Sequence, residues 1–414
     1  MTANEQTHAG SGVVILGAGQ AGGETALALR DFGYEGKITL IGEELWLPYR
    51  RPPLSKAFLS GIVDLDALLL ASNEDYAQLD IEVRTGLRAE VIDRAAHVVR
   101  LNDGGEIAYE KLVLALGGRP RRLALPGAKL RNVFCLRTAD DAIELRAALQ
   151  SSRKMVLIGA GYVGLEVAAV AVRTGLSVTV LEVADRVLAR SASPEMSRFY
   201  QQLHAGEGVS IKLGQAPIAI TGKNGVATGV QLAGGEIIAA DIVVVGVGLV
   251  PNIEIAEAAG IDCDNGIKID ENGQTSDPDI LACGDCANQF FPELGRSCRL
   301  ESVPAATGQA QAVAGTIVGA PEPYRELPWF WSDQFEIKLQ MAGLSQGYVE
   351  TVVRGAPESR AFCVFYLDAE SRVLAADAVN QPREHAQSKR LLGKSIGDRR
   401  RDLADPAVAL ADFF

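Results

Sequence analysis

Residues 13–22 read Val-Val-Ile-Leu-Gly-Ala-Gly-Gln-Ala-Gly, an apolar run of strand length that ends in the pattern Gly-x-Gly-x-x-Gly. A helix-compatible segment follows at residues 24–30, and a second β-branched run at residues 37–42 stops at Glu43. This acid lies 21 residues after the last glycine of the pattern. Strand, glycine loop, helix, strand and acid in this order predict a βαβ unit that binds a nucleotide. The alternative is a glycine-rich loop of an ordinary α/β fold.

The three glycines have separate tasks in such a unit. Gly17 allows the tight turn, Gly19 lets the backbone approach a pyrophosphate, and Gly22 lets the helix pack on the strand. The helix N-terminus then faces the phosphates, and the Glu43 carboxylate accepts hydrogen bonds from ribose hydroxyls. We therefore expect a first nucleotide site on these residues.

The same unit occurs a second time. Residues 154–164 again read as a strand that ends in the glycine pattern, and residues 165–181 continue as a helix and a strand. Glu182 follows, 18 residues after the last glycine. Two fingerprints in one chain predict two dinucleotides and hence electron transfer between them.

Composition narrows the class of protein. The chain has 414 residues, 48% of them hydrophobic, which is enough for two or three domains with a large core. It has no run of 18 apolar residues, and its polar residues 1–10 lack the apolar region of a secretory signal, so we expect a cytoplasmic protein without a membrane span. The net charge of −12 argues against nucleic acid as the main partner.

The six cysteines are scattered, and only Cys283 and Cys286 have suggestive spacing. A zinc site needs two more ligands, and the sequence has no second Cys-x-x-Cys and no histidine cluster, so we expect no metal. We favour the interpretation that the two cysteines are incidental, and a functional disulfide remains the alternative.

Each half of the chain reads as a βαβ unit, a hairpin and a closing strand, which is a repeat at the domain level. The closing strands are expected at residues 112–118 and 241–248, and the composition shifts to a strand-rich tail at residue 327. The stretch 383–401 reads as helical and basic, with seven Lys and Arg against two acids. It is either a docking surface for an acidic partner or a solvated helix face.

Residues 47–56 read Leu-Pro-Tyr-Arg-Arg-Pro-Pro-Leu-Ser-Lys, a loop that enters a helix, because the prolines forbid a regular helix start before Leu54. The loop brings Arg51 and Lys56 close to the first nucleotide unit. A lysine near a flavin stabilises negative charge on the reduced ring, although the local sequence alone favours an exposed basic loop.

Taken together, the motifs resemble those of the oxygenase-coupled, FAD-containing and NADH-dependent ferredoxin reductases, the putidaredoxin reductase type, over nearly the full length. The matching stretches are residues 17–22, 51–56, 114–118, 136–138, 159–166, 283–286, 299–303 and 328–333. The resemblance implies an α/β fold of the glutathione-reductase-like class, with two Rossmann-like domains and a C-terminal α+β domain. The implied domains are a discontinuous FAD-binding domain of residues 1–120 and 248–326, an NADH-binding domain of residues 121–247 and a C-terminal domain of residues 327–414.

The resemblance also implies contacts, with FAD on the first fingerprint and NADH on the second. The expected FAD contacts are Gly17, Gly19, Ala21, Gly22, Glu43, Arg51, Lys56, Ala89 (through its backbone), Arg137, Gly284, Asp285, Val303 and Trp331. The expected NADH contacts are Gly159, Gly161, Tyr162, Val163, Gly164, Glu166, Glu182 and Gly246. The Glu182 carboxylate would repel a 2′-phosphate and favour NADH over NADPH, although Arg186 and Arg190 downstream leave NADPH open.

The implied reaction is hydride transfer from NADH to flavin N5, followed by two one-electron transfers to a [2Fe-2S] ferredoxin (ferredoxin–NAD⁺ reductase, EC 1.18.1.-). The ferredoxin would supply a P450 or a Rieske-type oxygenase. Lys56, Glu166 and Trp331 are the expected catalytic residues: Lys56 would tune the flavin, paired with an acid such as Glu166, and Trp331 would shield the flavin and mark the electron exit. The plainer interpretations are a first-turn helix acid for Glu166 and a core aromatic for Trp331. Residues 47–59 hold no cysteine, so no dithiol relay is expected.

Two other functions stay open. A rubredoxin reductase or an NADH oxidase would use the same fold and sites. A redox-dependent interaction protein resembling apoptosis-inducing factor is disfavoured by the acidic charge of the chain. The expected partner is an acidic ferredoxin that docks transiently, on residues 383–401 in the simplest case, and the chain is expected to be a monomer or a homodimer.

Overall fold

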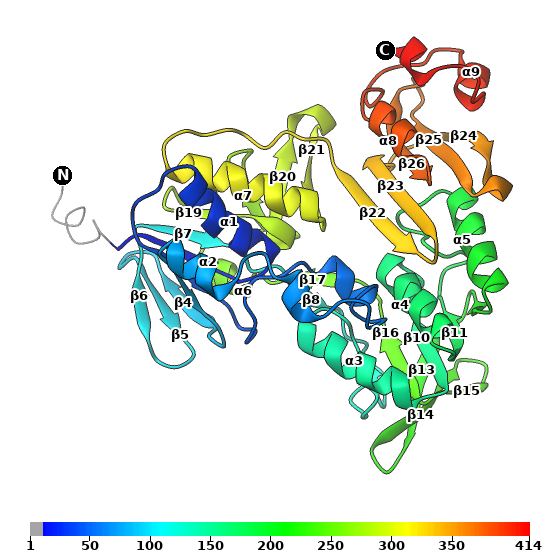
Figure 1. Cartoon of the computed structure of the whole chain (residues 1–414), viewed down its shortest axis with the longest axis horizontal. Coiled ribbons are helices and arrows are strands. Elements are labelled where there is room, and N and C mark those ends of the chain that lie inside the picture. Colours follow the sequence, from blue (N-terminus) through cyan, green and yellow to red (C-terminus); the bar gives the residue numbers. More distant parts are fainter. Residues whose placement is uncertain (1–10) are drawn as a thin grey trace. The chain divides into compact units, whose positions relative to one another are not determined.

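The computed structural model describes residues 11–414 (Figure 1). The polar residues 1–10, where we expect no secretory signal, lie outside the described residues. Contacts within the chain divide it into two compact units. Unit 1 holds the described part of Met1–Arg51, Asp64–Arg119 and Leu249–Glu326, and unit 2 holds Pro52–Val63, Pro120–Gly248 and Leu327–Phe414.

Unit 1 is built on a parallel sheet in the strand order β19-β7-β1-β2-β3. Its strands are β1 (Val13–Leu16), β2 (Ile38–Ile41), β3 (Ile81–Arg84), β7 (Lys111–Leu114) and β19 (Ile280–Ala282). Every residue of β1 and β2 is buried, as expected for β-branched runs covered on both faces. The helices α1 (Gln20–Asp31) and α7 (Val303–Ile317) pack against each other (Figure 1).

Three smaller antiparallel or mixed sheets complete unit 1. They are formed by β4 (Ala89–Asp93), β5 (Val98–Leu101) and β6 (Glu106–Ala108); by β18 (Ile267–Ile269), β20 (Ala287–Phe291) and β21 (Arg296–Arg299); and by β8 (Gly118–Pro120) with β17 (Leu249–Pro251). The remaining helices are α2 (Asn73–Gln78), α6 (Glu254–Ala258), η2 (Leu65–Leu68), η3 (Gly284–Cys286) and η4 (Pro292–Leu294).

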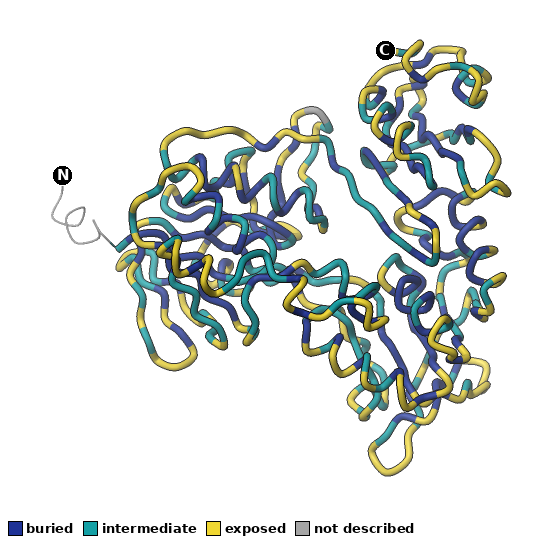
Figure 2. The backbone as a smooth tube through the Cα atoms, in the orientation of Figure 1, coloured by how far each residue is buried: buried dark blue, intermediate teal, exposed yellow. Residues whose placement is uncertain are grey.

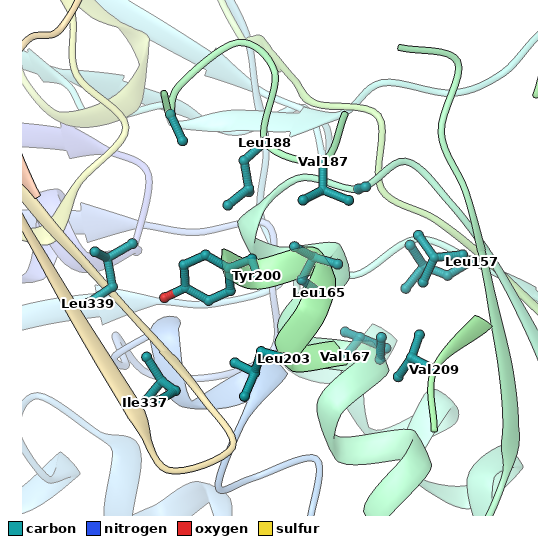
Figure 3. Close-up of a cluster of buried hydrophobic side chains, with 14 of the residues drawn as sticks. Leu157, Leu165, Val167, Val187, Leu188, Tyr200, Leu203, Val209, Ile337 and Leu339 are labelled. Atoms are coloured by element: carbon teal, nitrogen blue, oxygen red, sulfur yellow. The ribbon is translucent and has the colours of Figure 1, made fainter. Parts of the chain in front are cut away.

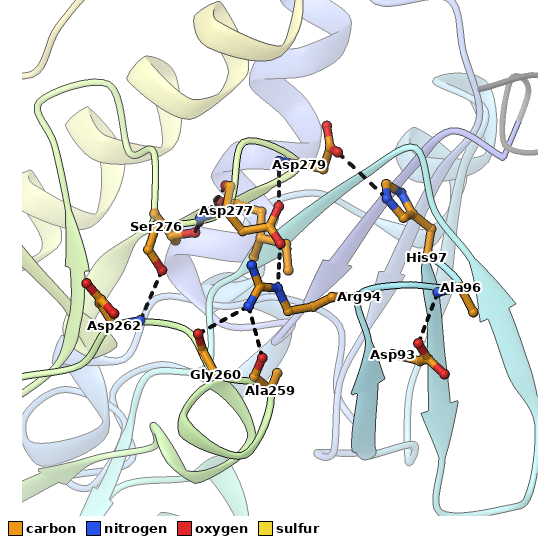
Figure 4. Close-up of polar contacts among 12 residues, drawn as sticks. Asp93, Arg94, Ala96, His97, Ala259, Gly260, Asp262, Ser276, Asp277 and Asp279 are labelled. Atoms are coloured by element: carbon orange, nitrogen blue, oxygen red, sulfur yellow. Dashed lines mark hydrogen bonds and ion pairs between the residues drawn. The ribbon is translucent and has the colours of Figure 1, made fainter. Parts of the chain in front are cut away.

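A polar cluster holds the β4-β5 hairpin to the loop before β19 (Figure 4). The Arg94 guanidinium, just past β4, donates to Asp277 at 2.5 Å and to two backbone carbonyls at residues 259 and 260. The His97 ring lies 3.7 Å from the Asp279 carboxylate and stacks on Tyr109. These contacts hold the loop that leads into β19 against the residues that follow β4.

Unit 2 repeats the parallel sheet, in the order β12-β11-β10-β16-β9. Its strands are β9 (Val133–Phe134), β10 (Lys154–Ile158), β11 (Ser177–Leu181), β12 (Ser210–Lys212) and β16 (Ile242–Val245), with α3 (Ala139–Ser151), α4 (Tyr162–Arg173) and α5 (Pro194–Gly206). An antiparallel sheet of β13 (Pro217–Lys223), β14 (Val226–Leu232) and β15 (Ile237–Ala239) lies between β12 and β16 in the chain, as the β4-β5-β6 sheet lies between β3 and β7. The α/β class with two Rossmann-like parallel sheets is confirmed.

The tail of unit 2 is an antiparallel sheet in the order β22-β23-β26-β25-β24. Its elements are β22 (Trp329–Gln334), β23 (Ile337–Gly343), β24 (Glu350–Ala356), β25 (Ala361–Leu367), β26 (Val373–Val379), α8 (Pro382–Ser388), α9 (Arg400–Ala404), η5 (Pro357–Ser359) and η6 (Leu410–Phe413). This sheet shares a core with the second nucleotide fold, because Ile337 and Leu339 pack in one cluster with Tyr200 and Leu203 of α5 (Figure 3). Figure 2 shows the buried strands at the centre of each unit.

Two expected helices are wrong in detail. The paired prolines themselves open a short 3₁₀ helix, η1 (Pro52–Ser55), which is followed by turns instead of a regular helix from Leu54. The basic stretch is broken, because α8 ends at Ser388 and α9 begins only at Arg400. Gly393 and Gly397 both have positive φ between these helices, a conformation that interrupts a helix. Within residues 11–414, no helix combines the length and the apolar character of a membrane span.

A buried carboxyl in the tail sheet makes stability depend on pH. Asp377 accepts a hydrogen bond from the Tyr366 hydroxyl at 2.5 Å, and burial raises the pKa of Asp377 to about 7. An acid whose pKa is raised on folding favours the folded state most below its unfolded pKa, and this contribution is lost as the pH rises towards 7. The loss reaches about 4 kcal/mol at full ionisation.

We therefore expect Asp377→Asn to flatten this part of the pH profile. The difference in thermal midpoint, variant minus parent, should be larger at pH 8 than at pH 5. Differential scanning fluorimetry measures both midpoints. Equal differences at the two pH values would show that Asp377 is ionised in the folded protein throughout that range.

Candidate functional site

The first glycine loop leaves open space at one position only. Gly17 has a φ of +109°, and a Cβ there would lie 2.1 Å from the Ala115 carbonyl oxygen. A Cβ on Gly22 would lie 1.8 Å from the Gly17 carbonyl oxygen. Among the described residues, a Cβ on Gly19 would meet only the Arg51 guanidinium, at 3.5 Å. Backbone atoms therefore leave no room for a side chain at Gly17 and Gly22, whereas space remains at Gly19.

This open position faces the beginning of α1. Gly19 is the N-cap residue and has no side chain to accept from the first amide N–H groups of the helix. Such amides and the positive end of the helix dipole attract an anion. The Arg51 guanidinium lies next to them and adds a full positive charge, so the geometry fits a phosphate group.

Arg51 is held in place by its own contacts. Its Nη2 lies 2.5 Å from the Glu44 carboxylate, and its Nη1 donates to the Tyr49 hydroxyl at 2.8 Å. Burial works against its charge, but electrostatic interactions with Tyr49, Glu44 and Asp285 raise the pKa of Arg51 above its ordinary value. Arg51 therefore stays a cation at the loop.

The carboxyl ends of the sheet in unit 1 bring several expected residues to one edge. Leu16 is paired with Ile41 and with Leu114, so the segments that follow these strands start at the same level. The Glu43 side chain is 72% exposed, with Arg88 at 3.7 Å. This carboxylate is accessible to a sugar hydroxyl.

The segment after β19 reaches the same loop. A Cβ on Gly284 would lie 2.8 Å from that of Ala21, so these two residues are neighbours although they are far apart in the sequence. Asp285 follows in η3, and its carbonyl oxygen accepts from Arg299 at 3.1 Å. Ala89 opens β4, and Val303 opens α7.

The second glycine loop has the same geometry in unit 2. Gly159 has a φ of +102°, and a Cβ there would lie 2.4 Å from the Gly246 carbonyl oxygen. A Cβ on Gly164 would lie 2.6 Å from the Gly159 carbonyl oxygen, whereas at Gly161 no described atom lies within 4 Å. Helix α4 begins directly after Gly161, at Tyr162, and Val163 is exposed in its first turn. This loop also fits a phosphate group.

Glu182, at the end of β11, is oriented by backbone amides. Its carboxylate accepts from the N–H of Ala160 at 2.8 Å and from that of Ala184 at 2.9 Å. Arg186, which left the choice of coenzyme open, is engaged elsewhere: it donates to the Ala189 and Ala192 carbonyls and to the Ser197 hydroxyl. Arg190 is exposed near Gly248.

The Lys56–Glu166 pair is a further polar centre of unit 2. Lys56 Nζ lies 2.8 Å from Glu166 Oε2, and the Glu166 side chain is only 3% exposed. The Ser55 hydroxyl donates to the same oxygen at 2.5 Å, and the Ser332 hydroxyl donates to Oε1 at 2.6 Å. The structure thus brings together the two residues that the sequence suggested as partners, and adds two serines that sequence reasoning missed.

Strand β22 places its aromatic residues beside a cation. The rings of Trp329 and Trp331 lie 5.7 Å apart, and Lys389 Nζ lies 4.3 Å from the centre of the Trp329 ring. Phe330 packs against Tyr162 at the start of α4. Trp331 is therefore half-buried in an aromatic group on the tail sheet, not in a closed core.

The three remaining predicted flavin contacts, Lys56, Arg137 and Trp331, lie in unit 2, whereas the others lie in unit 1. Arg137 precedes the N-cap of α3, and its backbone N–H donates to Asp141 at 3.0 Å. The contact of these three residues with a flavin stays a prediction.

The paired cysteines have the contacts of buried thiols. The Cys286 thiol donates to the Leu114 carbonyl at 3.4 Å, and Cys283 lies 3.6 Å from the Thr25 hydroxyl. Burial raises the pKa of Cys283 to about 11 and that of Cys286 to about 12, so both stay protonated and unreactive at neutral pH. All six cysteines are free, and within residues 11–414 no group of three or more His, Cys, Asp or Glu side chains is arranged to hold a metal ion.

Comparison with known proteins identifies the family. Residues 11–310 match the model of the pyridine nucleotide-disulphide oxidoreductases, and residues 329–414 match that of the reductase C-terminal domain. Rhodocoxin reductase from Rhodococcus erythropolis is 44% identical over 93% of this chain and 90% of its own length. A rubredoxin-NAD(+) reductase from Pseudomonas putida is 40% identical over 93% of this chain and 98% of its own length.

Among solved structures, the covalent putidaredoxin reductase–putidaredoxin complex matches with a TM-score of 0.93. The identity is 42%, and the match covers 97% of each chain. Together with the two glycine loops, these similarities decide the classification. The chain belongs to the pyridine nucleotide-disulphide oxidoreductase family and, within it, to the ferredoxin reductases of the putidaredoxin reductase type.

Proposed function

We propose that this protein takes electrons from NADH and passes them through FAD to a [2Fe-2S] ferredoxin that supplies a P450 or Rieske-type oxygenase. The observation that carries the proposal is the presence of two open glycine positions, Gly19 and Gly161, each before a helix at the carboxyl edge of a parallel sheet. Bound FAD accepts two electrons at once and releases them singly, which is the chemistry that joins a nicotinamide to a one-electron carrier.

We assign FAD to residues 1–120 and 248–326, NADH to residues 121–247, and partner contacts to the domain of residues 327–414. In unit 1, Gly19 and Arg51 would bind the pyrophosphate of FAD, Glu43 the ribose, and Asp285 a hydroxyl of the ribityl chain. In unit 2, Gly161 and the first turn of α4 would bind the pyrophosphate of NADH.

Lys56 would provide a positive charge at the flavin, and Glu166 would hold the lysine in position. The two buried serines that donate to Glu166 support this, because a carboxylate with two hydroxyl donors and a lysine keeps one fixed orientation. Trp331 would shield the flavin and mark the electron exit, and its place beside Trp329 and Lys389 supports contact with a partner.

Glu182 would select NADH. Its carboxylate is fixed by two backbone amides, so it would face a 2′-phosphate with a full charge, and the engaged Arg186 does not offset it. We expect Glu182→Gln to raise kcat/KM for NADPH about tenfold relative to that for NADH. The glutamine side chain keeps one oxygen that can accept from a backbone N–H, but it removes the negative charge. Steady-state rates with both coenzymes measure this ratio, and an unchanged ratio would place the selectivity elsewhere.

The partner would be an acidic ferredoxin that docks at residues 383–401. Several cations of this stretch already have partners: Arg400 pairs with Glu350, Arg399 with Asp402, and Arg390 and Lys394 lie over the Phe414 ring. Lys389 is the cation beside the aromatic group of β22. Docking would therefore combine charge attraction with a patch centred on Trp329 and Lys389. We place the protein in the cytoplasm, as a monomer or a homodimer.

A rubredoxin reductase is the second candidate, because a rubredoxin-NAD(+) reductase is among the similar proteins. It would use the same residues in both units and differ only at the docking surface. The choice between the two candidates therefore depends on the acceptor.

Anaerobic stopped-flow measurements test both candidates. The yellow protein is mixed with NADH and then with an oxidised [2Fe-2S] ferredoxin or a rubredoxin, and flavin bleaching and acceptor reduction are recorded. Fast bleaching and fast cluster reduction that slows as salt is raised would support ferredoxin docking through charge. Transfer only to rubredoxin would support the second candidate, and bleaching without transfer to any acceptor would contradict both.

A further inference from the structure

A line of buried polar side chains runs from Glu166 towards the second half of α5. Ser332 and Gln334 are two residues apart on β22 and point to the same side of that strand, and they are 0% and 1% exposed. Gln334 Nε2 donates to the Ser332 hydroxyl at 3.1 Å, and Gln334 Oε1 lies 2.8 Å from Nε2 of His204. His204 is itself 0% exposed.

We propose that His204, Gln334 and Ser332 are positioning residues that hold the Glu166 carboxylate and, through it, Lys56. The proposal rests on the proposed function for the consequence at the flavin, but the line of hydrogen bonds stands on the contacts above. The sequence gives no sign of it, because the three side chains come from α5 and β22, about 130 residues apart.

The direction of every hydrogen bond follows from the chemistry of the groups. An amide oxygen only accepts, so His204 must carry its proton on Nε2 and donate to Gln334. Burial lowers the pKa of His204 to about 4, which keeps the ring neutral, and its Nδ1 is buried with no hydrogen-bond partner among the described residues. The Gln334 amide then donates a hydrogen bond to the Ser332 oxygen, and the Ser332 hydroxyl donates a hydrogen bond to the Glu166 carboxylate.

All donors in this line point towards the carboxylate. Hydrogen bonds aligned in this way polarise one another, so the last donor, Ser332, is strengthened by the two behind it. Phe335 packs edge-on against the His204 ring and keeps it in place. With Ser332 on Oε1, and Ser55 and Lys56 on Oε2, both oxygens of Glu166 are fixed.

Two substitutions at His204 separate positioning from simple packing. Glutamine places an N–H donor close to where Nε2 lies, whereas asparagine is too short to reach Gln334. We expect His204→Asn to slow NADH-driven flavin bleaching about fivefold and Ser332→Ala about tenfold, the loss of a hydrogen bond to a charged group. His204→Gln should stay within about twofold of the parent. Gln334→Met breaks the line at a second place and should match His204→Asn.

The midpoint potential of the bound flavin is the second readout. It is measured by titration with a chemical reductant, so it needs neither NADH nor ferredoxin. His204→Asn, Gln334→Met and Ser332→Ala should shift it in the same direction, and His204→Gln should not. If the parent protein fails to bleach with NADH, the proposed function fails, while these shifts still decide the positioning proposal.

A double variant tests the route. If His204 acts through Ser332, adding His204→Asn to Ser332→Ala should change neither rate nor potential further. Additive effects, or single variants with the parent's rate and potential, would overturn the proposal. Ser193→Ala is the matched control: it removes the N-cap of the same helix α5, and should lower the thermal midpoint without changing the potential.

Discussion

Replacing Gly22 with alanine is expected to yield a protein without bound FAD and with a strongly lowered thermal midpoint. The added Cβ would lie 1.8 Å from the Gly17 carbonyl oxygen, which is part of the backbone and cannot turn aside. Helix α1 would have to move away from β1, and such overpacking costs roughly 3 kcal/mol or more. The ratio of flavin to protein absorbance and a thermal melt measure the two effects.

Gly19→Ala is the matched comparison for that variant. Within residues 11–414, its Cβ would meet only the Arg51 guanidinium at 3.5 Å, an ordinary contact, so the fold should be kept. FAD should nevertheless be lost, because the methyl group occupies the space assigned to the pyrophosphate. A Gly19→Ala protein that binds FAD as tightly as the parent would show that the phosphates lie elsewhere.

Gly161→Ala extends the comparison to the second loop. No described atom lies within 4 Å of its Cβ, so the fold and the FAD content should be unchanged. The affinity for NADH should fall, as measured by the NADH dependence of the bleaching rate. Loss of FAD in this variant would contradict the assignment of the two nucleotides to the two loops.

The two nucleotide folds are predictable because the residues that determine each of them lie close together in the sequence. Close packing of a turn, a strand and a helix needs glycine at Gly17 and Gly22, and the same need recurs at Gly159 and Gly164. The spacing of the glycines therefore indicates this packing directly. The hairpin and closing strand after each βαβ unit are predictable in the same way, although the closing strands, β7 (Lys111–Leu114) and β16 (Ile242–Val245), are shorter than the expected ranges 112–118 and 241–248.

The surroundings of Glu166 were not predictable beyond its pairing with Lys56. Ser55 lies in η1, and Ser332 and Gln334 lie in β22, both far from Glu166 in the sequence, and no local motif indicates that these elements meet it. The signal available was alternation along β22, which places Ser332 and Gln334 on the same face. Alternation alone does not say what that face meets.

Two helices expected from the sequence also differ in the structure, and contacts with distant residues are again the cause. The basic stretch 383–401 reads as helical in the sequence, but Gly393 and Gly397 adopt positive φ, and residues between α8 and α9 form bridges with Arg372 and Val373. Pro52 and Pro53 lie within a single 3₁₀ turn, η1, and Lys56 just beyond it contacts Glu166. Tertiary contacts outweigh helix propensity in both places.

Replacing Lys56 with methionine is expected to have the largest effect on catalysis. The change leaves the Glu166 carboxylate buried without its cation, and breaking one side of a buried pair costs about 3–5 kcal/mol. Ser55 and Ser332 still donate to Glu166, so we expect the lower end of this range. If Lys56 supports the flavin, NADH-driven bleaching should also slow by about 100-fold, as when one preorganised donor is removed from a site of developing charge.

The double variant Lys56→Met/Glu166→Gln separates these two effects. It leaves no unpaired charge, so the thermal midpoint should return close to that of the parent, while bleaching stays slow. Recovery of both stability and rate would mean that Lys56 only balances the charge of Glu166. Recovery of stability alone is the expected result, because we propose that Lys56 supplies the positive charge at the flavin and that Glu166, with its serine donors, holds the lysine in position.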